Sequence, residues 1–533
     1  MSHSSIRFEE SRQFNKIILD YVNGHENLAP YYHLKPEIGS YKQMMEQKNF
    51  NDSFRPILVE ELHKQYKQAN ILLKKNNPTT LNIDALQLTN TFTVTTGHQL
   101  CLLTGPLYFI HKIQSTIHWC KALKKAYPDK DFVPVFWMAS EDHDFAEINH
   151  VYINQHKYTW DIDSGQQPVG RISTKGIEHF MQQILPLATN NFALKQLEQW
   201  ISCYTESENL SVATRKLIHT LFGEEGLVII DADSPTFKNW FIPYIKKDVL
   251  EQQNFGTLNK TNSLLKQHYK TQVNGREINF FYLHNSGRKL ITNSNGNYHI
   301  EDTDLTFSEQ EIAKEITDFP ERFSPNVVMR PLYQEVILPN LSYIGGPGEI
   351  AYWLQLKEIF ALNEVTFPIL TLRNFVTIIK EQDFNALNKI GLSPSDLFKD
   401  DIELERHLVT LNDDGGQKIV IEDFDNYLQA LIEIAEKTDN TISSELLQHK
   451  LSWKASLLKI HQKLDKKQRE KVSHKIKKAM LIKEQYFVNK VMQERHFNIL
   501  TYGITLSVPQ LIAQIGTATG IKTGHIQLPV LPI

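Results

Sequence analysis

Three clusters of polar residues follow apolar runs that read as buried strands, and each cluster could do chemistry. The first comes after a strand expected to begin near Thr91, and the second follows the apolar run 132–138. The third is a glycine-rich turn at 345–349, after another strand-like run. In open parallel sheets, ligands bind outside the carboxyl ends of the strands. We therefore expect the three clusters to line one crevice at that edge of a sheet.

The first cluster suits a turn that a negatively charged ligand can approach closely. Gly97 lets the backbone turn sharply, and His98 could stabilise a transferring phosphate or move a proton near neutral pH. Gly105, before a proline and a helix, would leave backbone N–H groups free for an anion. A tight turn with a hydrogen-bonded histidine is the plainer alternative. The candidate residues here are Thr96, Gly97, His98, Gln99 and Gly105.

The second cluster concentrates negative charge. Neighbouring carboxylates repel one another unless they bind a cation, an amine or a basic side chain. They could hold Mg²⁺ on a nucleotide, bind the ammonium group of an amino acid or amino sugar, or include a general base. A solvated loop that caps the next helix is the plainer alternative, and the histidine spacing does not fit zinc. The candidate residues are Glu141, Asp142, His143, Asp144 and Asn149.

The third cluster is a turn whose backbone amides could bind a phosphate or a carboxylate. It matches neither the P-loop nor the dinucleotide-binding fingerprint. Glu349, in the first turn of the next helix, favours the helix dipole, which is a structural role in itself. Arg330 could bind a substrate carboxylate through two hydrogen bonds, or pair with a carboxylate of the chain. The candidate residues are Asn326, Arg330, Gly345, Gly346, Gly348 and Glu349.

Buried strands separated by helical segments must position these clusters. A further apolar run at 226–233 also ends in carboxylates, and 278–305 alternates in the manner of a β-hairpin. Near-continuous apolar strands are typical of a parallel sheet that is covered on both faces. The pattern predicts a doubly wound α/β domain over 1–378, with a helical N-terminal part and inserts near 155–225 and 255–325.

Beyond about Thr377, strand-like runs give way to long helical periodicity. No Pro or Gly occurs between Thr441 and Tyr502, which favours a helix long enough for a coiled coil. We expect an α-helical coiled-coil domain over 379–503, in which the long helix pairs with a helix near 421–436 and supports self-association. The tail 504–533 is expected to pack back on the core. The lysines of the long helix read as a solvated surface.

The composition excludes several classes of protein. With 533 residues, 41% of them hydrophobic, the chain is long enough for a large core. Its formal net charge of −4 does not suggest a nucleic-acid partner. No apolar run could span a bilayer, the first residues lack a signal core, and the three cysteines show no paired spacing. We therefore expect a cytoplasmic protein without a membrane, nucleic-acid or zinc partner.

Five stretches together resemble a known family. They read TGHQ…LLTGPLY, PVFW-x-A-x-EDHDFAEINHVY, GLVIIDAD, SPNVVMRPLYQEVILPNLSYIGGPGEIAYW and QERHFNIL, in order from about Thr95 to Leu500. They are similar to the cysteine ligase family of bacillithiol biosynthesis. The third position of the first motif is often Gln in that family, so His98 departs from its pattern.

The resemblance implies a Rossmann-like core with inserted connecting segments, a C-terminal coiled-coil domain and a homodimer. It also implies a ligase that joins cysteine to glucosaminyl-malate through an amide on the sugar amine. The catalytic candidates are then His98, Asp142, His143 and Asp144, and the other residues named above would bind substrate or nucleotide. Because a carboxylate must be activated before it acylates an amine, ATP with Mg²⁺ is the expected reagent.

Two alternatives stay open. The layout is loosely similar to the nucleotidylyl-transferase fold of class I aminoacyl-tRNA synthetases, although the chain lacks a clear HxGH or KMSKS motif. A nucleotidylyl transferase is therefore one alternative. A non-catalytic ligand-binding or scaffold α/β protein with a dimerising coiled coil is the other, because fold does not imply function.

Overall fold

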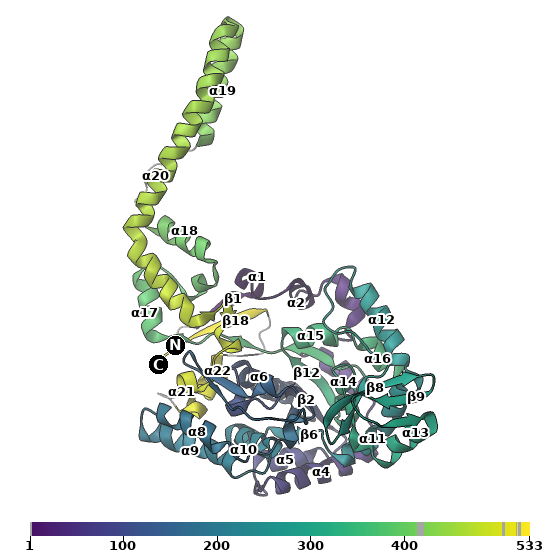
Figure 1. Ribbon diagram of the computed structural model, residues 1–533. Coiled ribbons are helices and arrows are strands. Elements are labelled where there is room, and N and C mark those ends of the chain that lie inside the picture. Colours follow the sequence, from purple (N-terminus) through teal and green to yellow (C-terminus); the bar gives the residue numbers. More distant parts are fainter. Residues whose placement is uncertain (1–2, 413–420, 504–506, 519, 521–523, 533) are drawn as a thin grey trace. The chain divides into compact units, whose positions relative to one another are not determined.

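The computed structural model describes residues 3–412, 421–503, 507–518, 520 and 524–532. The chain divides into two compact units, each described by itself below (Figure 1). The first unit comprises Met1–Ile378 and Lys490–Pro529, and the second comprises Ile379–Asn489 and Val530–Pro532. None of the helices in the described residues is both long and apolar enough to cross a membrane.

A five-stranded parallel sheet forms the centre of the first unit. Its strand order is β13-β12-β2-β3-β6, and every neighbouring pair is parallel. The strands are β2 (Thr91–His98), β3 (Asp131–Met138), β6 (Val228–Asp231), β12 (Asn340–Gly345) and β13 (Ile369–Leu372). Burial along all of them explains the near-continuous apolar runs. The expected parallel α/β sheet is confirmed.

The strand order places a switch point between β2 and β12. From β2 the chain adds β3 and then β6 on one side, and later adds β12 and β13 on the other side. Helix α6 (Tyr108–Ala126) follows β2 and packs on β2 and β3, whereas α15 (Pro347–Trp353) follows β12. Since these two connections leave in opposite directions, their first residues separate and leave room for a ligand.

Helices and a second sheet complete the first unit (Figure 1). Helix α4 (Arg55–Gln68) begins with a proline in its first turn and, with α5 (Pro78–Ala85), packs along β6. A hairpin of β4 (His150–Ile153) and β5 (His156–Thr159) precedes helices α8, α9 and α10, at Glu178–Ile184, Asn191–Thr205 and Leu210–Phe222. Helix α14 (Met329–Ile337) leads into β12.

The second insert carries a five-stranded antiparallel sheet, which includes the β-hairpin expected within 278–305. After α12 (Gln253–Leu265), its strand order is β10-β9-β8-β7-β11. The bounds are β7 (Phe280–His284), β8 (Gly287–Ser294), β9 (Asn297–Ile300), β10 (Thr306–Ser308) and β11 (Phe323–Pro325). Gly287 has φ +119°, a conformation that favours glycine, and lies opposite His284 at the turn.

The C-terminal strand β18 (His525–Leu531) returns to the N-terminal end of the chain. Within the first unit it pairs antiparallel with β1 (His3–Arg7) and parallel with β14 (Phe375–Val376). Residues 504–506, 519 and 521–523 of the expected tail lie outside the described residues. The described end of the tail is therefore a strand of the first unit, up to Pro529.

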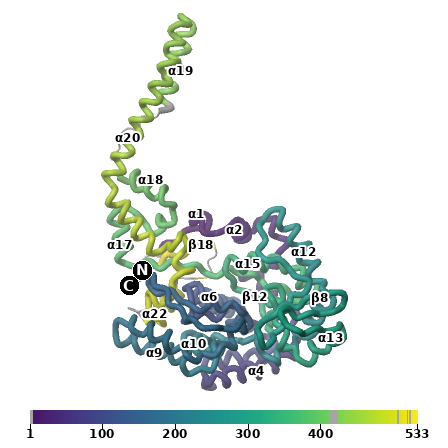
Figure 2. The backbone as a smooth tube through the Cα atoms, in the orientation of Figure 1, coloured from purple at the N-terminus to yellow at the C-terminus, as the bar shows by residue number. Residues whose placement is uncertain are grey.

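The second unit consists mainly of helices. Helix α20 (Asn440–Tyr486) has 47 residues and follows α19 (Ile421–Thr438), and the two lie antiparallel, since Lys450 bonds Gln429 and Lys454 bonds Asp425. This confirms the expected pairing, and Figure 2 shows the two helices as continuous tubes. Helices α17 (Glu381–Lys389) and α18 (Asp401–Leu411) complete the unit.

The second unit ends earlier than the boundary expected at residue 503. After α20, Asn489 and Lys490 adopt positive φ angles of 52° and 66° and turn the chain between two short strands. From Lys490 the chain belongs to the first unit, where the Leu107 N–H donates to the Phe497 carbonyl. The turn contains no Gly or Pro, so the sequence pattern did not reveal it.

Candidate active site at the carboxyl edge of the sheet

A pocket of about 620 Å³ opens at the carboxyl ends of β2, β3 and β12. Its lining includes Gly97 and His98 at the end of β2, Trp137 at the end of β3, and 346–349 after β12. These strands flank the switch point, where doubly wound sheets bind ligands. The structure therefore brings the first and third predicted clusters into one crevice.

The end of β2 contributes backbone and an uncharged imidazole. The Gly97 carbonyl accepts a hydrogen bond from the Lys112 ammonium. The Thr96 hydroxyl instead donates to the Ile344 carbonyl and so joins β2 to the neighbouring strand β12. Burial, together with the charges of Lys112 and Arg373, lowers the pKa of His98 to about 3. Its Nε2 atom is buried and has no hydrogen-bond partner among the described residues. His98 therefore offers a neutral ring to the pocket.

A buried ion pair occupies the glycine-rich turn. The Lys112 ammonium lies 2.9 Å from Glu349 Oε1, and the Tyr343 hydroxyl donates to the same oxygen at 2.6 Å. Burial raises the pKa of Glu349, but Lys112 and these donors outweigh it and hold the pKa at about 2. The Gly346 N–H donates to Glu349 Oε2 at 2.8 Å. This amide was expected to bind an anion, and it is used by the chain's own carboxylate instead.

Arg330 is a cation without a carboxylate partner. Its Nη1 and Nη2 atoms donate to Gln334 and to the Tyr352 hydroxyl, each at 3.2 Å. The guanidinium lies 5.6 Å from the ring centroid of Tyr343 and 6.0 Å from that of Trp353. No ion pair joins Arg330 to a carboxylate in the described part of the chain. A largely desolvated guanidinium of this kind suits a ligand carboxylate.

Asn326 and Gly345 support the pocket without lining it. The Asn326 side-chain oxygen accepts from the backbone N–H groups of Val328 and Met329, and its carbonyl accepts from the Arg330 N–H. Asn326 therefore fixes the start of α14 and, with it, the position of Arg330. The Gly345 carbonyl accepts from the Arg373 N–H at 3.0 Å. Gly348 does line the pocket, and open space lies where its Cβ would be.

The acidic cluster is divided between two roles. Glu141 is buried and pairs with Lys238, whose ammonium also donates to the Phe323 carbonyl. Burial raises the pKa of Glu141, and Lys238 opposes this effect. Asp144 accepts the Glu147 N–H and caps the short helix α7 (Phe145–Ile148). Neither side chain lines the pocket, and the cation that Glu141 meets is the basic side chain of Lys238.

Glu147 and Gln99 connect the acidic loop to the pocket. Both line it, and the Gln99 amide donates to Glu147 Oε2 and to Asp142 Oδ2, each at 2.7 Å. Asp142 therefore lies directly behind Gln99. His143 lies further away, against Arg288 at 3.4 Å, and burial and the charge of Arg288 lower its pKa. Of the acidic-loop residues, Asp142 and Asp144 each contact a residue of the pocket: Asp142 accepts from the Gln99 amide, and Asp144 accepts from the Glu147 N–H.

Gly105 and Asn149 lie outside the pocket. Gly105 has φ +60°, and a Cβ there would lie 2.6 Å from the Cβ of Cys101, so the position requires glycine. Its carbonyl accepts from the Asn498 amide at 2.6 Å, and the N–H of Leu107 is also bonded. The expected anion site before α6 is therefore filled by residues 497–498. Asn149 ends α7, and its side chain bonds His150.

Comparison with known proteins identifies the family. The model described as Bacillithiol biosynthesis BshC, N-terminal Rossmann-like domain, matches residues 1–374, and the BshC C-terminal coiled-coil domain matches 376–516. The chain belongs to the BshC family. This agrees with the resemblance seen in the five sequence motifs, and with the Rossmann-like and coiled-coil architecture.

Relatives in this family align over most of the chain. A protein of Flavobacterium psychrophilum named "Putative cysteine ligase BshC" is 41% identical over 509 residues, covering 93% of this chain and 94% of the relative. A Cytophaga hutchinsonii protein of the same name is 38% identical over 533 residues, covering 99% and 98%. A Bacillus cereus BshC protein is 29% identical over 399 residues, covering 73% of each.

Sequence reasoning missed several charged residues of this BshC pocket. Lys112, Arg373 and Arg495 all line it. Arg373 directly follows β13, so the rule that pointed to the other strand ends could have found it. Lys112 gives a weaker signal, since it is one lysine on a helix that mixes apolar and polar residues, and its burial, at 2% exposed, shows only in the structure.

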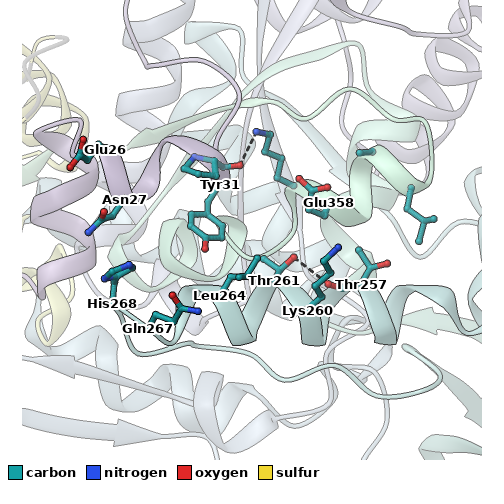
Figure 3. A pocket seen from close by; sticks show the side chains of 14 residues that line it. Glu26, Asn27, Tyr31, Thr257, Lys260, Thr261, Leu264, Gln267, His268 and Glu358 are labelled. Carbon is teal, nitrogen blue, oxygen red and sulfur yellow. Dashed lines mark hydrogen bonds between the residues drawn. The ribbon is translucent and has the colours of Figure 1, made fainter.

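A larger cavity of about 930 Å³ lies elsewhere in the first unit (Figure 3). It is bounded by Glu26–Tyr31, by α12 and by α16 (Lys357–Leu362), and none of the predicted site residues lines it. Lys260 and Lys357 face it together with Glu26 and Glu358, so its lining does not favour one sign of charge. In the described residues, no group of three or more His, Cys, Asp or Glu side chains could hold a metal ion.

Proposed function

We propose that this chain is a ligase of bacillithiol biosynthesis that forms an amide between cysteine and the amine of glucosaminyl-malate. Its relatives carry the name cysteine ligase. One observation supports the assignment most directly: the pocket combines the half-buried Arg330, which pairs with no carboxylate among the described residues, with the carboxylate of Glu147, which accepts a hydrogen bond from the Gln99 amide. A substrate with carboxylates at one end and an amine at the other fits this arrangement of charge.

In this proposal Arg330 binds a carboxylate of the malate group. A guanidinium has five N–H donors, and the contacts with Gln334 and Tyr352 use two of them. The remaining donors allow a bidentate contact with a carboxylate. Gly97 and Gly348 keep the walls of the pocket free of side chains, which lets the sugar approach the backbone.

The amine of the sugar would lie near Glu147. An ammonium must lose protons as the amide forms, and Glu147 and Asp142, joined by Gln99, are carboxylates within reach of that position. His98 has a pKa of about 3 and is therefore a poor proton carrier near neutral pH. We propose that its Nε2 atom accepts a hydrogen bond from the substrate. His143 and Asp144 would act only on the conformation of the acidic loop.

We propose ATP with Mg²⁺ as the co-substrate that activates the cysteine carboxylate. When bound, ATP would supply the acyl-adenylate or acyl-phosphate that an amide-forming step needs. The cation Arg495 and the open backbone at Gly348 line the same pocket and suit a phosphate. We further propose that the protein works in the cytoplasm as a homodimer joined through α19 and α20, with no nucleic-acid or membrane partner.

A turnover assay tests the proposal. The purified protein is mixed with cysteine, glucosaminyl-malate, ATP and Mg²⁺, and the products are followed by mass spectrometry, with ATP omitted in parallel. We expect the mass of bacillithiol only when ATP is present, together with AMP or ADP. A nucleotide attached to the sugar product would indicate a transferase instead. Tight binding of glucosaminyl-malate without turnover would support the binding-protein alternative.

A further inference from the structure

Arg373 lines the pocket, and its Nε–H has no acceptor among the described residues. The residue follows β13 and is 3% exposed. Its Nη1 and Nη2 atoms donate to Glu494 at 2.9 Å and 2.6 Å, and Nη1 also donates to the Asn374 carbonyl. Its Nε atom is buried and has no hydrogen-bond partner among the described residues. These three hydrogen bonds use three of the five N–H donors, so Nε–H and the second N–H of Nη2 remain for a ligand, and Nε is the nitrogen with no partner at all among the described residues.

Two buried residues hold this guanidinium in place. Glu494 is 0% exposed and accepts a third hydrogen bond, at 2.9 Å, from Nδ1 of His111, which is also 0% exposed. Burial raises the pKa of Glu494, but Arg373 and His111 outweigh it and hold the pKa at about 2. Burial lowers the pKa of His111, so its ring is neutral and donates through Nδ1–H. The guanidinium also lies 4.1 Å from the ring centroid of Phe375.

The surroundings of the unfilled donor point to a polar ligand. A Cβ built on Gly346 would lie 3.9 Å from Arg373 Nε, so glycine there keeps the approach to the donor open. His98 Nε2, in the same pocket, is the second buried polar atom without a partner. Buried donors and acceptors in folded proteins are nearly always paired. Two unpaired atoms in one pocket therefore indicate positions that a bound substrate fills.

We propose that Arg373 Nε–H binds a carboxylate oxygen of a substrate, and that Glu494 and His111 are positioning residues for this contact. The inference rests on the proposed ligase function. Because the Arg373–Glu494 pair is neutral overall, this contact recognises a ligand through the direction of the Nε–H bond rather than through net charge. It differs in this respect from Arg330, which has no carboxylate partner. The two arginines would thus engage two different carboxylate groups.

The carboxylate could belong to glucosaminyl-malate or to cysteine, and the two sources are separated by measuring each substrate by itself. Calorimetry gives the affinity for glucosaminyl-malate without turnover, and steady-state assays give KM for each substrate and kcat. The variants are Glu494→Gln, which removes the charge, and Glu494→Asp, which restores it on a shorter side chain. Glu315→Gln is the matched control, since Glu315 accepts from Arg322 and Tyr282 outside the pocket.

The expected result is a change confined to one substrate. Glu494→Gln should raise KM for the substrate that meets Nε–H by roughly 10-fold or more, the effect of one charge-assisted hydrogen bond. KM for the other substrate should stay within about 2-fold. Glu494→Asp should recover part of the loss. Glu315→Gln should leave both KM values unchanged, even where it lowers the melting temperature.

Several outcomes would overturn the inference. Unchanged KM values in folded Glu494→Gln, or a fall of kcat with equal changes in both KM values, would show that Glu494 only stabilises the fold. If Glu494→Gln does not fold, Arg373→Lys decides, because lysine keeps the charge and lacks Nε–H, and an unchanged KM there overturns the proposal. If the wild-type protein neither binds nor converts glucosaminyl-malate, the proposed function itself is refuted. If the wild type is active and the variants behave like it, only the role of Arg373 and Glu494 is refuted.

Discussion

Replacing Arg330 by Met should weaken binding of glucosaminyl-malate with little change in the shape of the pocket. Methionine is unbranched and matches the arginine side chain as far as Nε, but it removes the guanidinium together with its contacts to the rings of Tyr343 and Trp353. Hydrogen bonds to charged groups contribute about 1.5–3 kcal/mol each. A bidentate contact at the lower value contributes about 3 kcal/mol, which corresponds to a roughly 100-fold loss of affinity.

Changing the ligand as well as the protein shows whether the loss of affinity comes from the contact with the malate carboxylate. Calorimetric titration would compare glucosaminyl-malate with methyl glucosaminide, which lacks the malate group. The Arg330→Met change should weaken the first ligand and leave the second within about 2-fold. Arg330→Lys keeps the charge without the planar fork and should give an intermediate loss, about 10-fold. Arg276→Met serves as the control, since Arg276 is exposed and does not line the pocket.

One result would refute this reasoning. If Arg330→Met weakens both ligands equally, the side chain supports the pocket through its contacts with Gln334 and Tyr352 and does not bind a carboxylate. The melting temperature of the variant must be measured in parallel. A stable variant with unchanged affinity for glucosaminyl-malate would place the malate group elsewhere and would remove the main structural support for the proposed function.

Three further changes test other parts of the molecule. Glu349→Gln removes the carboxylate partner of the buried Lys112 and should lower the free energy of unfolding by about 3 kcal/mol. The pKa of Glu349 is depressed to about 2. In denaturant titrations, the difference in the free energy of unfolding between wild type and variant should therefore be full above about pH 4.5 and vanish as the pH falls toward 2. Leu451→Glu, at a site 75% exposed on α20, should give a monomer by light scattering, whereas Leu72→Glu, 82% exposed, should not. His98→Gln should keep turnover within about 10-fold, and a loss of about 1,000-fold would instead indicate proton transfer through this ring.

The sheet and its ligand-binding edge could be predicted because their signals are local. An apolar run buried on both faces reads as a strand of a parallel sheet, and polar residues directly after it mark the carboxyl edge. This reasoning identified β2, β3 and β12 and brought Gly97 and Gly346 to one pocket. The compact unit that contains the long helix ends at Asn489, where Asn489 and Lys490 turn the chain without a Gly or Pro that the sequence pattern could have marked.

The roles of charged residues could not be predicted in the same way, because each depends on a partner that is distant in the sequence. Glu141 and Asp142 are neighbours, yet Lys238 neutralises the first while the second bonds Gln99. The sequence predicted that the glycine-rich turn could bind an anion, but in the structure Lys112 and the Gly346 N–H both contact Glu349.

Charge compensation therefore separates the structural residues from the ligand-binding ones at this edge. Lys112 and Glu349 neutralise each other in the wall of the pocket, and Lys238 and Glu141 neutralise each other outside it. Among the described residues, Arg330 lacks a carboxylate partner, and Arg373 Nε–H has no acceptor although Glu494 neutralises the guanidinium. Since leaving a desolvated cation or donor unsatisfied destabilises the folded state, we propose that a substrate contributes most to binding at these two positions. The arginines, rather than the acidic loop, are the parts of the site that should set its specificity for carboxylates.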